Sequence, residues 1–219
     1  MAHSIPELLQ KNEIDSLKEL LGADPNLANG KTEQGLSYLQ LATYYRNKEA
    51  IALLRENKNS IDLHEAAAIG DPAAVRFQIS ITPDLIDSYS TDGFTALGLA
   101  CFFGHVDVVK YLIDKGANVN KPSSNSFHVA PIHSAAAISD YEIISLLLAH
   151  GADVNVRQQG GVTPLHSAGH NGQTKIAKLL IDHGADTDAK TDDGKTAVDM
   201  ALEKNYTETA DFIRSCSTN

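Results

Sequence analysis

Aromatic residues, cysteines and long apolar runs are scarce in this chain of 219 residues. Aromatics make up 6% of it and tryptophan is absent, so the places where aromatics cluster carry information. Cys101 and Cys216 have no Cys or His partner at zinc spacing, which favours free thiols in a reducing compartment. No apolar run approaches the ~18 residues of a membrane span, and no N-terminal stretch indicates a signal peptide. We therefore expect a cytoplasmic protein that does not enter a membrane.

Positive charge is also scarce. The chain has 18 Lys and Arg against 28 Asp and Glu, a net charge of −10, with a pI near 5.3. This balance argues against a nucleic-acid or anionic-membrane surface, because binding there draws mainly on Lys and Arg. Half of the excess lies in residues 182–219. That acidic end is either a polar cap that keeps a terminal repeat soluble or a docking surface for a basic partner.

One stretch has the features of a self-contained pair of helices. Thr163 suits the N-cap of a helix and Pro164 its first position, where the missing N–H of proline costs nothing. A second helix is expected from Thr174, with its apolar residues on one face and Gly184 just beyond its end. Two helices this short cannot bury their apolar faces on each other alone, so the pair needs neighbours.

Similar pairs recur along the chain. An apolar residue near the start of each first helix, here called the anchor, repeats every 33 to 35 residues, apart from one interval of 24. The anchors are Ile5, Leu39, Leu63, Leu97, Ile132, Leu165 and Val198. A turn between the two helices is expected seven residues after each anchor, at Asn12, Arg46, Gly70, Gly104, Ser139, Gly172 and Asn205. A glycine also stands four residues before four of the anchors.

This spacing, the Thr-Pro-Leu-His-x-Ala motif at 163–168 and the Gly-Ala-Asx-Val-Asn motifs at 116–120 and 151–155 resemble the ankyrin-repeat family. The resemblance covers nearly the whole chain. It implies an all-α fold, an α-solenoid of stacked ankyrin-type helix–turn–helix repeats with β-hairpin fingers, in a single domain. The expected repeats are 1–33 (an N-terminal cap), 34–60 (shortened), 61–91, 92–126, 127–159, 160–192 and 193–219 (a C-terminal cap).

Three local departures from the pattern give sharper expectations. The short interval between Leu39 and Leu63 lacks the length of one finger, so that finger should be absent. His128 occupies a slot that is glycine in other fingers, and because a bulky residue disfavours a positive φ, this finger should have a different shape. The second helix of the first repeat should close at Gly22.

Nine histidines invite a catalytic or metal-binding interpretation. However, His64, His133 and His166 each follow an anchor, and the resemblance implies that this side chain hydrogen-bonds neighbouring backbone and ties repeats together. His150 and His183 fall in the last turns of second helices, where a cation suits the helix dipole. No catalytic, phosphate-binding or dinucleotide-binding motif is present. The sequence therefore predicts no enzyme, no metal site and no cofactor.

The resemblance places the first helix of each repeat on a concave side, with the fingers along one edge. Residues five and six positions after the anchor should face this side, and the residue three positions before it lies on the finger. Apolar and aromatic residues gather at these positions in the middle of the chain, which is typical of a binding surface, although they could instead cover neighbouring repeats. The candidate partner-binding residues are Tyr44, Tyr45, Ile69, Phe94, Phe102, Phe103, Phe127, Val129, Ile138, Val162 and His170.

We therefore predict a non-enzymatic protein–protein interaction module, a monomer that binds another protein or a peptide through its concave face and fingers. No nucleic acid, membrane or cofactor is expected. The alternatives are a structural scaffold that acts by self-association, and a small-ligand receptor or enzyme. The resemblance also raises Asn120 and Asn155 as candidate hydroxylation acceptors.

Overall fold

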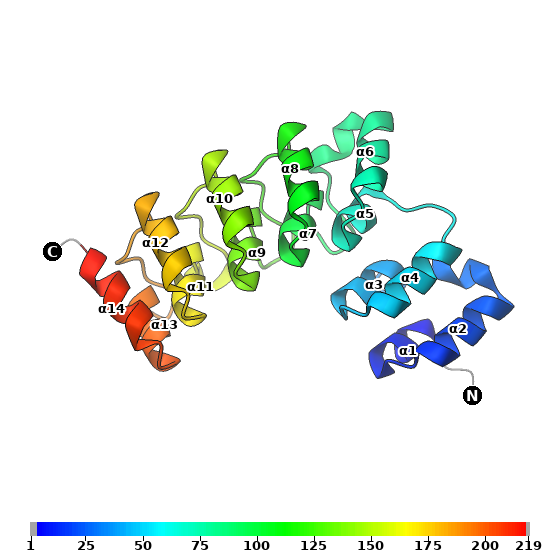
Figure 1. Cartoon of the computed structure of the whole chain (residues 1–219), viewed down its shortest axis with the longest axis horizontal. Coiled ribbons are helices and arrows are strands. Elements are labelled where there is room, and N and C mark those ends of the chain that lie inside the picture. Colours follow the sequence, from blue (N-terminus) through cyan, green and yellow to red (C-terminus); the bar gives the residue numbers. More distant parts are fainter. Residues whose placement is uncertain (1–3, 218–219) are drawn as a thin grey trace. The chain divides into compact units, whose positions relative to one another are not determined.

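The structure, a computed structural model, describes residues 4–217. These residues form fourteen α-helices and three short 3-10 helices, without a strand (Figure 1). The helices come in pairs that match the seven predicted anchors, so the predicted all-α repeat fold is confirmed. The chain divides into two compact units, of which the first ends at Leu85 and the second begins at Ile86. That all repeats form a single domain stays a prediction.

Unit 1 contains three helix pairs. Its core is a cluster of leucines and alanines, among which Leu17, Leu39 and Leu54 have no exposed surface. The first helices pack in sequence, α1 on α3 and α3 on α5. The helices are α1 (Ile5–Lys11), α2 (Ile14–Ala23), α3 (Tyr38–Tyr44), α4 (Lys48–Asn57), α5 (Leu63–Ile69) and α6 (Pro72–Ile81), with the 3-10 helix η1 (Pro25–Asn29).

Unit 2 contains four helix pairs, arranged as a layer of first helices and a layer of second helices (Figure 1). The anchors Leu97, Ile132 and Leu165 are at most 1% exposed and join the pairs in one core. The helices are α7 (Ala96–Phe103), α8 (Val106–Asp114), α9 (Pro131–Ile138), α10 (Tyr141–Ala149), α11 (Pro164–His170), α12 (Thr174–Asp182), α13 (Ala197–Glu203) and α14 (Thr207–Cys216). The 3-10 helices η2 (Pro83–Asp87) and η3 (Gln159–Gly161) lie in connections.

The turns inside the helix pairs share one backbone conformation. All seven predicted turn residues have a positive φ, between 53° and 79°. Glycine adopts this conformation without strain, and Asn12 and Asn205 belong to the residue type that tolerates it next best. Arg46 adopts it as well, with φ 53°. The predicted turn positions are therefore confirmed.

Two sequence-based expectations about backbone conformation are wrong. Gly22 does not close α2, because the helix continues to Ala23 and the N–H of Asp24 still donates to Leu20 O at 3.1 Å. His128 does adopt a positive φ, of 53°. Its finger is held from within, since Asn125 Oδ1 accepts hydrogen bonds from the N–H of Phe127 and from Ser123 Oγ.

The fingers are tight turns with little ladder pairing. In a typical one, the N–H of Thr191 donates to Lys195 O and the N–H of Gly194 donates to Thr191 O, both at 2.9 Å. The finger that contains His128 is longer and closes with a hydrogen bond from the N–H of Ser123 to Val129 O. Residues 58–62 join α4 directly to α5, where the shortened interval predicts that a finger is missing.

Gly169 sets how closely α11 approaches α13. A Cβ atom on Gly169 would collide with the carbonyl oxygen of Ala197. We expect Gly169→Ala to lower the free energy of unfolding by about 1–3 kcal/mol, in spite of the better helix propensity of alanine. Gly22→Ala is the matched control, because nothing lies within 4 Å of its Cβ position, and it should be neutral or stabilising by up to ~1 kcal/mol. Urea denaturation followed by circular dichroism measures both; equal effects would contradict the close approach.

Candidate protein-binding surface

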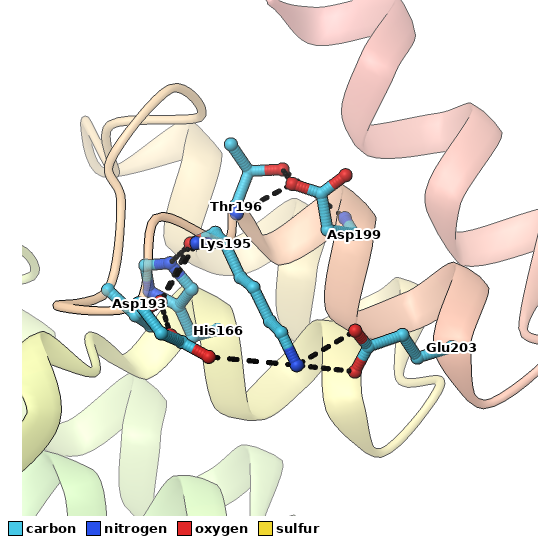
Figure 2. Close-up of polar contacts among 7 residues, drawn as sticks. His166, Asp193, Lys195, Thr196, Asp199 and Glu203 are labelled. Carbon is cyan, nitrogen blue, oxygen red and sulfur yellow. Dashed lines mark hydrogen bonds and ion pairs between the residues drawn. The ribbon is translucent and has the colours of Figure 1, made fainter.

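Two positions of the repeat come together on one face of unit 2 in its last two repeats. The finger position lies three residues before the anchor, and the helix-end position lies five residues after it. In the last repeat these are Lys195 and Glu203, whose Nζ and Oε1 atoms are 2.8 Å apart (Figure 2). In the repeat before, Val162 and His170 line one groove. We call the surface made by these two positions and the residue after the helix-end position the inner face.

The groove on the inner face has a volume of about 260 Å³. Ala137 of α9 and Met200 of α13 line it together with residues of α11. Ala137 and His170 are exposed and Val162 is half-buried. The structure therefore brings two predicted site residues, Val162 and His170, together at an open groove.

The α7 end of the inner face is aromatic. Phe102 and Phe103 are both half-buried, and their rings are perpendicular with centroids 5.1 Å apart. Phe103 also stacks on His105 at 6.4 Å. The half-buried Ile138 of the next repeat lies close by, because a Cβ atom on Gly104 would be 3.4 Å from its Cδ1 atom. Each of these predicted residues thus has a packed side and an accessible side.

Three successive first helices of unit 2 carry no carboxylate, ammonium or guanidinium group. The helices α7, α9 and α11 contain no Asp, Glu, Lys or Arg, whereas α13 contains Asp199 and Glu203. Charged residues stand instead on the second helices of the same repeats, for example Lys110 of α8 and Glu142 of α10, which form an exposed ion pair. The uncharged stretch of the inner face therefore favours contact with apolar groups.

The predicted finger residues of unit 2 lie at different depths. Phe94, Val129 and Val162 are half-buried, whereas the Phe127 side chain is 57% exposed. The backbone of Phe127 is fixed to the next finger, because its carbonyl accepts a hydrogen bond of 2.9 Å from the N–H of Gln159. Phe127 is not among the residues that line the inner-face groove, so the structure does not bring it together with Val162 and His170.

The remaining predicted residues belong to unit 1. Tyr45 is 48% exposed, while Tyr44 and Ile69 are half-buried. Tyr45 lines a groove of about 630 Å³ together with residues of α1 and α4. That these residues of unit 1 take part in binding a partner stays a prediction.

A larger groove lies on the second-helix layer of unit 2, and sequence reasoning missed it. Its volume is about 900 Å³, and residues of α10, α12 and α14 line it. Tyr141, at the start of α10, is 51% exposed beside it. The available signal is that Tyr141 stands where the other second helices of unit 2 begin with Val106 or threonine.

Unit 1 also has an exposed apolar pair that sequence reasoning missed. Phe77 and Ile81, four residues apart on α6, are 62% and 60% exposed. The buried residues of this helix, Val75 and Ile79, lie on another of its faces. The signal was the presence of apolar residues on more than one face of a short helix.

Two of the repeat histidines, His133 and His166, connect backbone segments. His133 Nδ1 accepts from the N–H of Ala130 at 3.2 Å, so its Nε2–H is the donor to the carbonyls of Val156 and Val162, at 3.1 and 3.2 Å. Burial lowers the pKa of His133 from 6.5 to about 4, and the two carbonyl acceptors offset part of this shift. The backbone-tying role that the resemblance implies is therefore confirmed for His133.

His166, in the next repeat of unit 2, has the same arrangement. Its Nδ1 accepts from the N–H of Thr163 at 3.2 Å, and its Nε2 lies 3.1 Å from Lys195 O (Figure 2). Burial lowers the pKa of His166 as well. His150 and His183 instead direct Nδ1 to the carbonyl four residues earlier, at 2.8 Å in both cases, at the ends of α10 and α12.

The described part of the chain has no side-chain cluster suited to a metal ion. Among residues 4–217, no group of three or more His, Cys, Asp or Glu side chains is placed to hold a metal ion. Cys101 is buried in α7, where burial raises the pKa of its thiol, and Cys216 is half-buried; both are free. Every helix in the same span is too short or too polar to cross a bilayer.

Helix pairs with positive-φ turns and projecting fingers define a helical repeat protein. A family model of ankyrin repeats, three copies in length, matches residues 63–158 and 132–219. Because these matches cover more than half of the sequence, the chain belongs to the ankyrin-repeat family. Proteins of this family are generally protein–protein interaction modules and typically not enzymes.

Three curated relatives illustrate the range of similarity. The human BCL-6 corepressor-like protein 1 is 35% identical over 111 residues, which are 51% of this chain and 6% of that protein. The probable 26S proteasome regulatory subunit p28 of Saccharomyces cerevisiae is 27% identical over 176 residues, 74% of this chain and 76% of that protein. A putative ankyrin repeat protein of Acanthamoeba polyphaga mimivirus is 32% identical over 159 residues, 68% of this chain and 20% of that protein. The chain thus spans only small parts of the human and viral relatives.

Proposed function

We propose that the inner face of unit 2 binds an apolar segment of another protein. The observation that supports this most is the run of three uncharged first helices, α7, α9 and α11, with accessible aromatic and aliphatic side chains at their ends. Soluble proteins seldom leave such surfaces contiguous unless they bind something there. The yeast relative is named as a regulatory subunit of the proteasome. From that name we carry over only the general role of a component that binds other proteins.

The packing of Phe102 and Phe103 within the repeat limits how much of their surface a partner can bury. Phe102 packs on Phe103, which also stacks on His105, so part of the surface of both rings already stabilises the repeat. The accessible remainder, with Ile138 and the groove beside Ala137 and His170, supplies the contact area for the partner. Aromatic side chains in such settings are the residues most often found as hot spots, where truncation costs about 2 kcal/mol or more.

The test begins with affinity purification from the native host and mass spectrometry, followed by calorimetry with the captured partner. We expect Phe102→Ala/Phe103→Ala to weaken binding by about thirtyfold or more, because hot-spot contacts are lost. The matched control is Tyr141→Ala, which truncates an exposed aromatic on the second-helix layer and should leave the affinity unchanged.

The double variant could lose affinity through unfolding, so a second variant separates the two causes. Ala137→Arg adds bulk and charge at an exposed position of the groove without removing any packed side chain. It should also weaken binding while circular dichroism shows an intact fold. Wild-type affinity in both variants, with the fold intact, would reject the inner face as the binding surface.

A further inference from the structure

The inner face of unit 2 changes character from one end to the other. From α7 to α13, the residues at the finger and helix-end positions are Phe94 with Phe102, Val129 with Ala137, Val162 with His170, and Lys195 with Glu203. The first pair is aromatic, the second aliphatic, the third mixed and the last ionic. Because these are equivalent positions in the repeat, the surface has a direction along which its polarity rises.

At the ionic end, two carboxylates share the ammonium group of Lys195. Lys195 Nζ lies between Asp193 and Glu203, 3.7 Å from Asp193 Oδ2 and 2.8 Å from Glu203 Oε1 (Figure 2). Asp199, in the first turn of α13, adds a third carboxylate, which accepts hydrogen bonds from the N–H and the hydroxyl of Thr196. Lys190 also acts on Asp199, and Lys204 follows Glu203. The single ammonium of Lys195 is nevertheless shared by the carboxylates of Asp193 and Glu203, so negative charge is in local excess beside it.

Hydrogen bonds stabilise the ionised forms of Asp193 and Asp199, and Asp193 and Glu203 are accessible. The hydroxyl of Thr191 lowers the pKa of Asp193, and the N–H of Thr196 lowers that of Asp199. The Glu203 and Asp193 side chains are 52% and 64% exposed. A positive group of a partner could therefore reach them from solvent.

The uncharged part of the inner face, in contrast, disfavours charged groups of a partner. A Lys, Arg, Asp or Glu of a partner laid against α7, α9 or α11 would lose part of its hydration, and these helices offer no opposite charge in return. Complementary charge at an interface selects partners and fixes register more than it adds raw affinity. The α13 end would thus decide the direction in which a bound segment lies.

We infer that the bound segment is apolar and uncharged where it faces α7 to α11 and carries a Lys or Arg side chain where it reaches Asp193 and Glu203 at α13. This rests on the proposed function, because it describes the occupant of the same surface. The cationic group would lie at the edge of the inner face, where Lys195 leaves the carboxylate excess uncompensated.

The experiment is a selection of peptides from a phage-displayed random library on the full chain, followed by affinity measurements on the selected sequences. We expect an apolar cluster with Lys or Arg at one end. Glu203→Gln should weaken these peptides about threefold, as expected for one partly exposed charge pair. Asp211→Asn is the matched control, because it removes an exposed carboxylate that has its own cationic partner, Arg214, on α14, and it should change nothing. A repeated selection on the Glu203→Lys chain should favour Asp or Glu at that end.

The outcomes separate the two proposals. In one outcome, the selected peptides bind less tightly to the Phe102→Ala/Phe103→Ala or Ala137→Arg chain but show no preference for Lys or Arg and bind the Glu203→Gln chain as tightly as the wild type. This result would overturn the inference and leave the inner face as the binding surface. If no selected peptide responds to any of these variants, the proposed function itself fails. Peptides that respond to both sets and reverse their charge preference with Glu203→Lys would establish the inference.

Discussion

Replacing Glu65 with alanine is expected to lower the free energy of unfolding by about 3–5 kcal/mol, because it leaves a buried ammonium group unpaired. Lys58 Nζ lies 3.0 Å from Glu65 Oε1, and the two side chains are only 8% and 2% exposed. The other carboxylate oxygen of Glu65 accepts a hydrogen bond from the N–H of Asp62 at 3.0 Å. The Glu65 side chain therefore both pairs with the charge of Lys58 and caps α5, at the connection that lacks a finger.

An exposed ion pair of the same length provides the control. Lys178 Nζ lies 3.0 Å from Asp182 Oδ2, but the two side chains are 62% and 54% exposed. Asp182→Ala should therefore change the stability by less than ~1 kcal/mol. Urea denaturation followed by circular dichroism suits both measurements, since the chain has no tryptophan to report by fluorescence.

A double variant tests whether the unpaired charge is the cause. In Lys58→Met/Glu65→Gln the ammonium is gone and the glutamine can still accept from the N–H of Asp62, so most of the lost stability should return. If Glu65→Ala costs no more than Asp182→Ala, the pair is not buried in solution and the explanation is wrong.

The repeat frame could be predicted because each of its landmarks has a local backbone cause. The turn seven residues after the anchor needs a positive φ, which Gly70, Gly104 and Gly172 provide at no steric cost. Once these had fixed the period, Arg46 and Ser139 could be placed in the same conformation from their position alone, and the structure has them at φ 53° and 68°. His128 was misjudged because residue type was given more weight there than position.

The Lys58–Glu65 pair could not be predicted from the sequence. The two residues are seven positions apart across an irregular connection, where no periodicity indicates which side chains meet. The low exposure of both depends on how residues 58–62 cross the ends of α4 and α5. Such a contact is set by tertiary packing, and periodicity reports only which face of an element is apolar.

For the candidate site, the sequence predicted where residues stand in the repeat better than it predicted which side chains surround them. It placed Phe102, Val162 and His170 on one side of the repeat, and the structure brings the last two together at a groove. It could not determine how much of each ring neighbouring side chains cover. The groove beside Tyr141 was not predicted because residues of second helices line it, whereas the predicted binding positions lie on first helices and fingers.

Acidification is expected to destabilise the protein through His133 by about 3 kcal/mol between pH 6.5 and pH 4, because its pKa falls from 6.5 to about 4 on folding. In this window the unfolded chain binds a proton at this site that the folded chain does not, so the free energy of unfolding falls as the pH falls. The decline should level off below the folded pKa. The physical reason is that a proton on Nδ1 would point at the N–H of Ala130, which now donates to that atom.

The measurement compares urea denaturation of the wild-type chain and of His133→Gln at several pH values. The variant is less stable at neutral pH, because it loses the hydrogen bonds to the carbonyls of Val156 and Val162. Its stability should nevertheless depend less steeply on pH, so that the two curves converge as the pH falls. His166→Gln should flatten the curve in the same direction, since burial lowers that pKa too. Parallel curves for the wild type and His133→Gln would contradict a neutral, buried imidazole as the tie between the repeats.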